Sequence, residues 1–363
     1  MLRGLTIALV VLGLAAPAQG AVSREFVGTH HFRDPSRDDF ERMAEATAIY
    51  RANLYWPAVE QFEPGMRDWS RYDAVIGGAA RSGIRVMATV YGSTDWAAAS
   101  PEHPPDAAHR DDFGSFLEAA VRRYGRGGEF WAAHPELPAL PVRAWELWNE
   151  PNNPTFWLAR PTAAQYRRLL VVAARAVRRA DPSAQVVLGG LFPTAYSSAG
   201  IAMPAYLAAL YGSGADRYFD AVAVHPYGRD PEAAFEVVER ARAIMDTRGD
   251  SEKPIWITEI GWATSGSEST VTVSERAQAE YLRETVTTAA ARRRQLGIAG
   301  LFWFSYRDQE DDGWPARTGL LRADGSEKPS WRALLALTEE GWAETVVAAI
   351  RGLTTRIAAA ARR

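Results

Sequence analysis

Eight short apolar runs recur along this chain, and segments of helical spacing or long loops separate them. Each run is rich in branched and aromatic residues and ends near a glycine, a proline or a polar residue, which is typical of buried strands. The runs cover residues 25–32, 48–56, 84–91, 143–150, 184–191, 219–227, 254–262 and 298–306. Strands that alternate with helices form parallel βαβ units, and eight such units favour an α/β fold of the (β/α)8 barrel type.

An open doubly wound sheet is the main alternative fold. Such a sheet binds dinucleotides through a glycine-rich loop that follows its first strand. Here the first run ends in Gly28-Thr29-His30-His31-Phe32, which lacks that glycine pattern. The sequence therefore favours the closed barrel.

The amino-terminal segment has the composition of a signal peptide. Residues 1–20 carry one positive charge, then an apolar stretch at 5–16 and small residues up to Gly20. This stretch is shorter than the roughly 20 residues of a spanning helix, so we expect cleavage near Gly20 and secretion rather than a membrane anchor. We assign the barrel to residues 21–338. Residues 339–363 are rich in alanine and arginine with apolar residues at helical spacing, and we expect them to form a helical extension.

Composition argues against several classes of function. The chain has 363 residues and a formal net charge of −3, without a polybasic region, so neither nucleic acid nor an anionic membrane is an expected partner. Cysteine is absent, which excludes disulfides and thiolate chemistry. The six histidines form no HExxH pattern, and we expect neither a metal nor another cofactor. The sequence leaves the oligomeric state open.

Two of the apolar runs end in a carboxylate. Glu150 precedes Pro151, which stops the fourth strand, and Glu259 lies in the seventh run in Thr258-Glu259-Ile260-Gly261-Trp262. A lone glutamate at a strand end is often only a salt-bridge partner. Two at matching positions indicate acid/base or nucleophilic chemistry, because the carboxyl ends of barrel strands meet at one face.

These motifs resemble the retaining glycoside hydrolases of clan A, among them the cellulase-like family 5 and the β-xylosidase-like family 39. The resemblance rests on Trp148-Asn149-Glu150-Pro151, His225-Pro226-Tyr227 and Thr258-Glu259-Ile260-Gly261-Trp262. It implies a carbohydrate substrate, with Glu150 as general acid/base and Glu259 as nucleophile. Two carboxyl groups about 5 to 5.5 Å apart would form a covalent glycosyl-enzyme, whereas a wider gap would admit a water and invert.

The resemblance also implies roles for two neighbours of the glutamates. Arg51 would hydrogen-bond Glu259 and favour its charged form, although a structural ion pair with Glu146 is an alternative. Asn149 would contact the sugar 2-hydroxyl, although it could instead stabilise the turn before proline. Strict strand alternation puts Asn149 and Glu150 on opposite faces, so both reach one site only if the strand ends in a bulge or turn.

Further strand-end residues complete the expected site. His225 and Tyr227 share strand parity, and we expect both to reach Glu259. Trp303 is similar to the tryptophan that forms the floor under the sugar in the clan, unless it fills the barrel instead. The remaining candidates for the pocket wall are Trp56, Trp262, Tyr91, His30 and His31. Tyr91 departs from the pattern, because many relatives carry a histidine at the end of this strand.

Three functions fit these residues. The first is a secreted hydrolase of β-type O-glycosidic bonds, acting on poly- or oligosaccharides by double displacement. A transglycosylase would use the same glutamates with a sugar hydroxyl as the acceptor. A non-catalytic polysaccharide-binding barrel would need neither glutamate, and both are present. The long loops after the third, fourth, seventh and eighth strands would shape the sugar subsites.

Overall fold

The computed structural model describes residues 22–338, except 159, 195–198, 267–269 and 312. The predicted signal peptide at 1–20 and the predicted helical extension at 339–363 lie outside the described residues. Among the residues described, no helix is long and apolar enough to cross a membrane.

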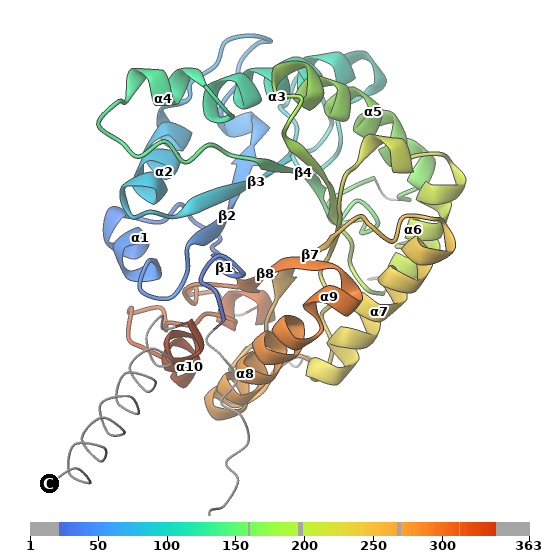
Figure 1. The fold of residues 1–363 in the computed structure, drawn as a ribbon. Coiled ribbons are helices and arrows are strands. Elements are labelled where there is room, and N and C mark those ends of the chain that lie inside the picture. Colours follow the sequence, from blue (N-terminus) through green and yellow to red (C-terminus); the bar gives the residue numbers. More distant parts are fainter. Residues whose placement is uncertain (1–21, 159, 195–198, 267–269, 312, 339–363) are drawn as a thin grey trace, which may run out of the picture. The chain divides into compact units, whose positions relative to one another are not determined.

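Eight parallel strands form the centre of the fold (Figure 1). They are β1 (Val27–His30), β2 (Ile49–Tyr55), β3 (Arg85–Tyr91), β4 (Ala144–Asn149), β5 (Gln185–Gly190), β6 (Val222–Val224), β7 (Ile255–Ile260) and β8 (Ile298–Phe304). The hydrogen-bonded order is β5-β4-β3-β2-β1-β8-β7-β6. The ring closes between β5 and β6, where the amide of Leu188 donates to the carbonyl of Ala221 at 2.9 Å. The predicted (β/α)8 barrel is confirmed.

Helices cover the outside of the strand ring (Figure 1). They are α1 (Arg37–Met43), α2 (Ser70–Arg81), α3 (Arg110–Tyr124), α4 (Glu129–Ala133), α5 (Ala163–Ala180), α6 (Met203–Gly212), α7 (Pro231–Thr247), α8 (Glu275–Ala291), α9 (Arg293–Leu296) and α10 (Pro329–Thr338). The 3-10 turns of the described residues are η1 (Trp56–Ala58), η2 (Ala107–His109), η3 (Asp216–Tyr218) and η4 (Trp314–Arg317).

Two of the helices, α5 and α8, begin at a side chain that caps their first turn. Thr162 Oγ1 accepts a hydrogen bond from the amide of Gln165, and the Gln165 side chain accepts one from the amide of Thr162, forming a capping box before α5. Ser274 caps α8 by accepting from the amide of Ala277 at 3.2 Å. Helix α4 was not predicted, because its five residues lie in a connector rich in glycine and proline.

Apolar side chains fill both sides of the strand ring. Most of the core packs between strands and helices, while a smaller cluster consists of Met87, Val187, Ala221, Ala223 and Phe302. Met87 pairs with Arg51 across β2 and β3, and paired residues share a face of a sheet. This small cluster therefore lies on the same inner face as Arg51 and supports the polar residues above it.

Candidate active site

A cavity of about 300 Å³ lies at the carboxyl ends of the strands. Both predicted catalytic residues, Glu150 and Glu259, line it, together with Asn149, Tyr91 and Tyr227. Its other lining residues are His30, Phe32, Asn53, Asn153, Thr155, Phe156, Phe192, Phe304, Trp314 and Pro315. The strand ends thus bring residues from distant parts of the sequence to one place, as the barrel fold predicts.

The backbone at the end of β4 departs from the regular pleat. Trp148 and Glu150 have positive φ angles of 81° and 42°, which are uncommon for residues other than glycine. Asn149 pairs with Gly190 of β5, yet its neighbour Glu150 lines the same cavity. The irregularity that the sequence required for Asn149 and Glu150 to share a site is therefore present.

Glu259 is held as a carboxylate by two donors. Arg51 donates from Nη1 to Glu259 Oε1 at 2.7 Å, and the hydroxyl of Tyr227 donates to Oε2 at 2.9 Å. Burial alone would raise the pKa of Glu259, but the charges of His225 and Arg51 outweigh it and lower the pKa to about 2. Glu259 is therefore ionised at neutral pH, as a nucleophile must be.

Glu150 has a different set of partners. His225 Nδ1 lies 2.8 Å from Glu150 Oε1, and Asn153 donates from Nδ2 to Oε2 at 2.6 Å. Burial lowers the pKa of His225, but the charge of Glu259 and the hydrogen bond to Glu150 outweigh it and raise that pKa. His225 was expected to reach Glu259, and its Nδ1 does lie at ion-pair distance from Glu259 Oε2, 3.6 Å away, while its hydrogen bond goes to Glu150.

A buried polar layer beneath the cavity connects the two glutamates. Arg51 is fully buried and donates to Glu146 Oε2 at 2.6 Å and to Asn149 Oδ1 at 2.9 Å, in addition to Glu259. The sequence offered a hydrogen bond from Arg51 to Glu259 and an ion pair with Glu146 as alternatives, and the structure contains both contacts. Thr258 donates to Glu146 Oε1 at 2.8 Å and lies 3.0 Å from His225 Nε2, which completes a connection to Glu150.

Glu146 is well satisfied although it is a buried charge. Besides Arg51 and Thr258, it accepts hydrogen bonds from Thr89 Oγ1 at 2.5 Å and from the amide of Gly190 at 3.0 Å. Buried carboxylates persist only with such partners. The sequence named Glu146 only as a possible partner of Arg51, and the contributions of Thr89 and Thr258 were missed.

The structure places Phe304, and not Trp303, on the cavity wall. Trp303 is fully buried, and its indole nitrogen donates to the carbonyl of Thr318 at 3.0 Å. It pairs with Thr29, whose hydroxyl contacts Met43 of α1, so this face of the sheet points outward. Successive residues of a strand face opposite sides, and Phe304 therefore faces inward. The prediction that Trp303 forms the floor under the sugar is therefore wrong by one residue, since Phe304 lines the cavity.

Of the two histidines predicted at the end of β1, only His30 reaches the cavity of the two glutamates. His31 lines a neighbouring cavity, whereas His30 lines the cavity of the two glutamates. The Nδ1 atom of His30 lies 2.9 Å from the carbonyl oxygen of Arg51, so it donates to that oxygen. Burial and the charge of Arg51 lower the pKa of His30 to about 3 and keep the ring neutral.

Two other tryptophans proposed for the pocket wall are core residues. Trp56 is fully buried and packs against Trp96 and Phe113, with ring centroids 5.2 and 5.5 Å apart. Trp262 is also fully buried and donates its indole hydrogen to the carbonyl of Gly228 at 2.8 Å. Neither lines the cavity that contains the two glutamates.

Sequence reasoning missed several residues of the cavity wall. Asn153 follows the Asn149-Glu150-Pro151 motif closely, and a third amide so near the motif was an available signal. Phe304 shares strand parity with the inward-facing Phe302, which could have indicated its direction. Asn53, Phe156 and the residues of η4 gave no comparable signal, because loops determine where they lie.

Three side chains of the site are also close enough to hold a metal ion. One ligand atom each from Glu150, His225 and Glu259 lies within 4.8 Å of the others. However, these groups already bond to one another or to protein donors, and the guanidinium of Arg51 contacts Glu259 directly. A neighbouring positive charge opposes binding of a cation. The arrangement fits acid/base and nucleophilic carboxylates better than metal ligands.

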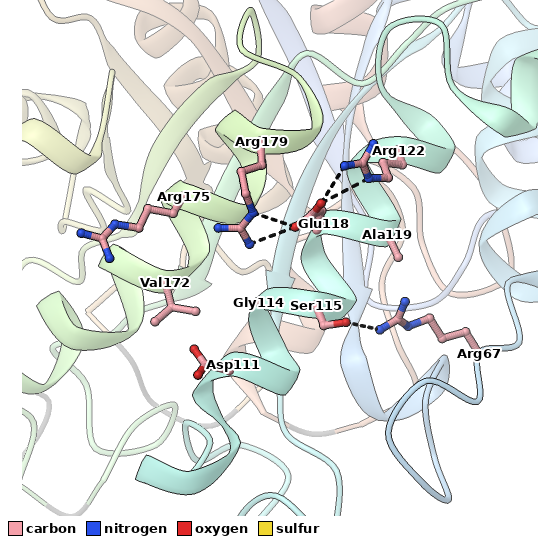
Figure 2. A pocket seen from close by; sticks show the side chains of 10 residues that line it. All are labelled: Arg67, Asp111, Gly114, Ser115, Glu118, Ala119, Arg122, Val172, Arg175 and Arg179. Carbon is pink, nitrogen blue, oxygen red and sulfur yellow. Dashed lines mark hydrogen bonds and ion pairs between the residues drawn. The ribbon is translucent and has the colours of Figure 1, made fainter.

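A larger hollow of about 500 Å³ lies away from the strand ends, between α3 and α5 (Figure 2). Glu118 lies between two arginines there, 2.7 Å from Arg122 and 2.9 Å from Arg179. A carboxylate engaged by two cations is unsuited to proton transfer. This hollow therefore is an ion-paired contact between helices rather than the catalytic site.

Several solved structures of glycoside hydrolases resemble this fold. The chain is similar in structure to a family 39 glycoside hydrolase from Bacteroides cellulosilyticus WH2, with 21% identity, a TM-score of 0.66, and coverage of 88% of this chain and 64% of that one. It is also similar to a glucosidase from Croceicoccus marinus, with 18% identity, a TM-score of 0.63, and coverage of 87% and 68%. A GH5_18 protein from Bifidobacterium longum subsp. infantis shows 18% identity, a TM-score of 0.59, and coverage of 87% and 79%.

At these identities the likeness establishes the fold, and this chain spans less than two thirds of the length of the family 39 enzyme. No curated protein sequence matches the chain. The sequence model of a family described as "Glycosyl hydrolase catalytic core" matches residues 147–332, which is just over half of the chain and includes both Glu150 and Glu259. The protein therefore belongs to the glycosyl hydrolase catalytic core family.

Proposed function

We propose that this glycoside hydrolase cleaves a β-type O-glycosidic bond with retention of configuration, using Glu259 as nucleophile and Glu150 as general acid/base. The observation that carries the proposal is the short separation of the two carboxylates, which have oxygen atoms within 4.8 Å of each other. Inverting enzymes hold these groups about 6.5 to 9.5 Å apart to admit a water, whereas about 5 to 5.5 Å fits a covalent intermediate.

The reaction takes place in two displacements. First, an oxygen of Glu259 bonds to the anomeric carbon while the bond from that carbon to the glycosidic oxygen breaks, and Glu150 gives its proton to the departing oxygen. Next, Glu150 takes a proton from a water, the oxygen of that water bonds to the anomeric carbon, and Glu259 departs as a carboxylate. The sugar leaves with a new hydroxyl, and both glutamates return to their initial protonation states.

The partners of each glutamate fit these roles. Arg51 and Tyr227 stabilise the negative charge of Glu259 and keep it ready to attack. His225 and Asn153 each contact one oxygen of Glu150 and hold the carboxyl group in place. They fix its orientation toward the glycosidic oxygen, which positioned proton transfer requires.

Asn149 is oriented for contact with the sugar. Its Oδ1 accepts from Arg51, so its amide NH₂ group, which makes no hydrogen bond within the described residues, can donate to a substrate hydroxyl. We propose the sugar 2-hydroxyl as that acceptor. A donor in this place strengthens its bond as charge develops at the anomeric centre.

The direct test is release of new reducing ends from β-linked polysaccharides and aryl β-glycosides by the protein lacking residues 1–20. We expect one substrate class to be cleaved and the Glu259→Gln variant to be inactive. Glu252→Gln, a change at an exposed glutamate, is the matched control and should retain full activity. Transfer of the sugar to an added acceptor in preference to water would identify a transglycosylase. Polysaccharide binding without cleavage by either protein would favour a non-catalytic barrel.

We also propose that the protein is secreted, because residues 1–20 have the charge and apolar pattern of a signal peptide. Expression of the full chain in a bacterial host tests this proposal. The exported protein should lack a segment that ends near Gly20, as measured by intact mass. An unprocessed chain retained inside the cell would contradict it.

A further inference from the structure

A second cavity adjoins the one that contains the two glutamates. It has a volume of about 220 Å³ and lies beside the ends of β1, β2 and β3. The two cavities share four lining residues, namely Phe32, Asn53, Tyr91 and Phe156. A molecule bound at Glu150 and Glu259 can therefore extend into this second cavity without leaving the protein surface.

Several polar groups on its wall have no hydrogen-bond partner among the described residues. The amide of Asn53 and the hydroxyls of Tyr55 and Tyr91 make no hydrogen bond within the part of the chain that the structure describes. The Nδ1 atom of His31 also has no partner there, and this side chain is buried, with 7% of its surface exposed. Asn53, Tyr55 and Tyr91 are only partly buried and their unpaired groups are open to solvent, so a ligand with many hydroxyls can bond to them in place of water.

The charges around the second cavity point to a neutral ligand. Arg71 Nε lies 2.5 Å from Asp34 Oδ2, so this cation is balanced by a carboxylate, and both side chains are partly exposed. Glu102 adds a second negative charge, and burial lowers the pKa of His31 to about 4, which leaves that ring neutral. The wall therefore carries a slight excess of negative charge, which opposes an acidic sugar.

Aromatic surface completes the cavity. The rings of Tyr55 and Tyr91 pack with centroids 5.2 Å apart, and Phe32, which borders both cavities, is 43% exposed. Phe32 is held edge-on against Phe304 of the catalytic cavity, with centroids 4.7 Å apart. Apolar rings beside convergent polar groups are typical of ligand sites.

We propose that the second cavity, lined by His31, Asn53, Tyr55, Arg71 and Tyr91, binds a further neutral sugar unit, linked to the one that is attacked at Glu259. This inference rests on the proposed function and extends it, because it defines the substrate class as neutral oligosaccharides rather than single sugars on a small leaving group. The terminal nitrogens of Arg71 and the hydroxyl of Tyr55 donate to hydroxyls of this unit.

Chain-length dependence of hydrolysis tests the proposal. We expect kcat/KM to rise about 10-fold or more between an aryl β-glycoside of one sugar and neutral oligosaccharides of two to five units, as one or two hydrogen bonds with a charged donor would provide. Arg71→Met and Tyr55→Phe should remove most of this gain and change kcat/KM for the aryl monosaccharide less than twofold. Arg37→Met, which removes another exposed, ion-paired arginine, is the control.

Two results would overturn the proposal. One is a kcat/KM that does not depend on chain length; the other is an equal loss on short and long substrates in Arg71→Met, which would mark a structural role. If the wild type cleaves nothing, the proposed function fails, and calorimetric binding of neutral oligosaccharides still decides the subsite. Wild type should then bind them about 10-fold more tightly than Arg71→Met, and equal affinity, or tighter binding of uronic acid oligosaccharides, would refute it.

Discussion

Gly190, at the end of β5, lies directly against the imidazole ring of His225. A Cβ atom on Gly190 would lie 2.1 Å from His225 Nε2, a distance that no side chain can occupy. His225 in turn bonds Glu150 through Nδ1 at 2.8 Å. The lack of a side chain at position 190 therefore allows His225 to orient the proposed acid/base.

Substituting Gly190→Ala should displace His225 and weaken its bond to Glu150. We expect kcat to fall about 10-fold or more on substrates with a poor leaving group, which depend on proton donation, and less on dinitrophenyl glycosides, since loss of general acid catalysis typically costs about 10² to 10⁴-fold. Gly212→Ala is the control, because a Cβ there meets nothing within 4 Å. An equal loss on both substrates would instead indicate general damage to the fold.

The hydroxyl of Tyr227 helps to keep Glu259 ionised, and its loss should alter the pH profile. With Glu259 as the proposed nucleophile, we expect activity only above its pKa, which the site lowers to about 2. Tyr227→Phe removes a donor to the charged form, so the acid limb of kcat/KM should move to higher pH by about one unit. Tyr281→Phe, whose hydroxyl makes no hydrogen bond to the described residues, should leave the limb in place. An unmoved limb in Tyr227→Phe would contradict the role.

The different positions of Phe304 and Trp303 lead to opposite effects of mutation. Phe304→Leu should lower kcat/KM about 10-fold with a small change in stability, because the aromatic wall beside His30 is lost. Trp303→Phe should lower the free energy of unfolding by about 1 to 3 kcal/mol and change kcat/KM less than twofold. Urea unfolding and steady-state kinetics on both variants decide the matter. A large loss of kcat/KM in Trp303→Phe, with only a loss of stability in Phe304→Leu, would show that Trp303 forms the floor under the sugar.

Buried neutral histidines should make the protein sensitive to mild acid. Burial lowers the pKa of His31 to about 4 and that of His30 to about 3, while an unfolded histidine titrates near 6.5. Between pH 6.5 and 4 the unfolded chain binds more protons, so stability falls as pH falls, by at most about 1.4 kcal/mol per pH unit for each ring. His225 has the opposite sign, because its raised pKa stabilises the fold below 6.5 and loses this effect as pH rises.

Replacing His31 with asparagine separates the contribution of His31 to the pH dependence of stability from those of His30 and His225. Urea unfolding of wild type and His31→Asn at pH 6.5, 5.5 and 4.5 should show a shallower loss of stability in the variant. Glu259 does not interfere, since its lowered pKa gives stability that is complete above its unfolded value near 4.5 and is lost only as pH falls toward 2. Parallel curves for the two proteins would show that His31 is not the neutral group described here.

The sequence predicted the barrel and its two glutamates because both depend on local signals. Apolar runs with breakers mark strands, and parallel strands bring their carboxyl ends together, so Glu150 and Glu259 could be placed without coordinates. An error of one residue arose at Trp303, and the sequence named both His30 and His31 without distinguishing them, because the direction of the pleat relative to the helix layer decides which neighbour faces inward. Strand periodicity alone does not supply that direction.

The polar layer under the cavity was harder to predict. Glu146 bonds Arg51, Thr89 and Thr258, which lie on three other strands, and only the registers of those strands bring them together. The second cavity depends on loops after β1, β2 and β3, whose conformation sequence patterns do not encode. Local signals therefore predicted that the two glutamates meet at one face, while long-range pairing and loop geometry determined their surroundings.

The anomeric form of the first product distinguishes double displacement at Glu259 from single displacement by water. Proton NMR during the first minutes of hydrolysis of a β-linked substrate, before the free sugar mutarotates, distinguishes the two outcomes. The short separation of Glu150 and Glu259 predicts that the β anomer appears first and that Glu259→Gln yields neither anomer. Initial release of the α anomer would show single displacement by water and would contradict the assignment of Glu259 as nucleophile.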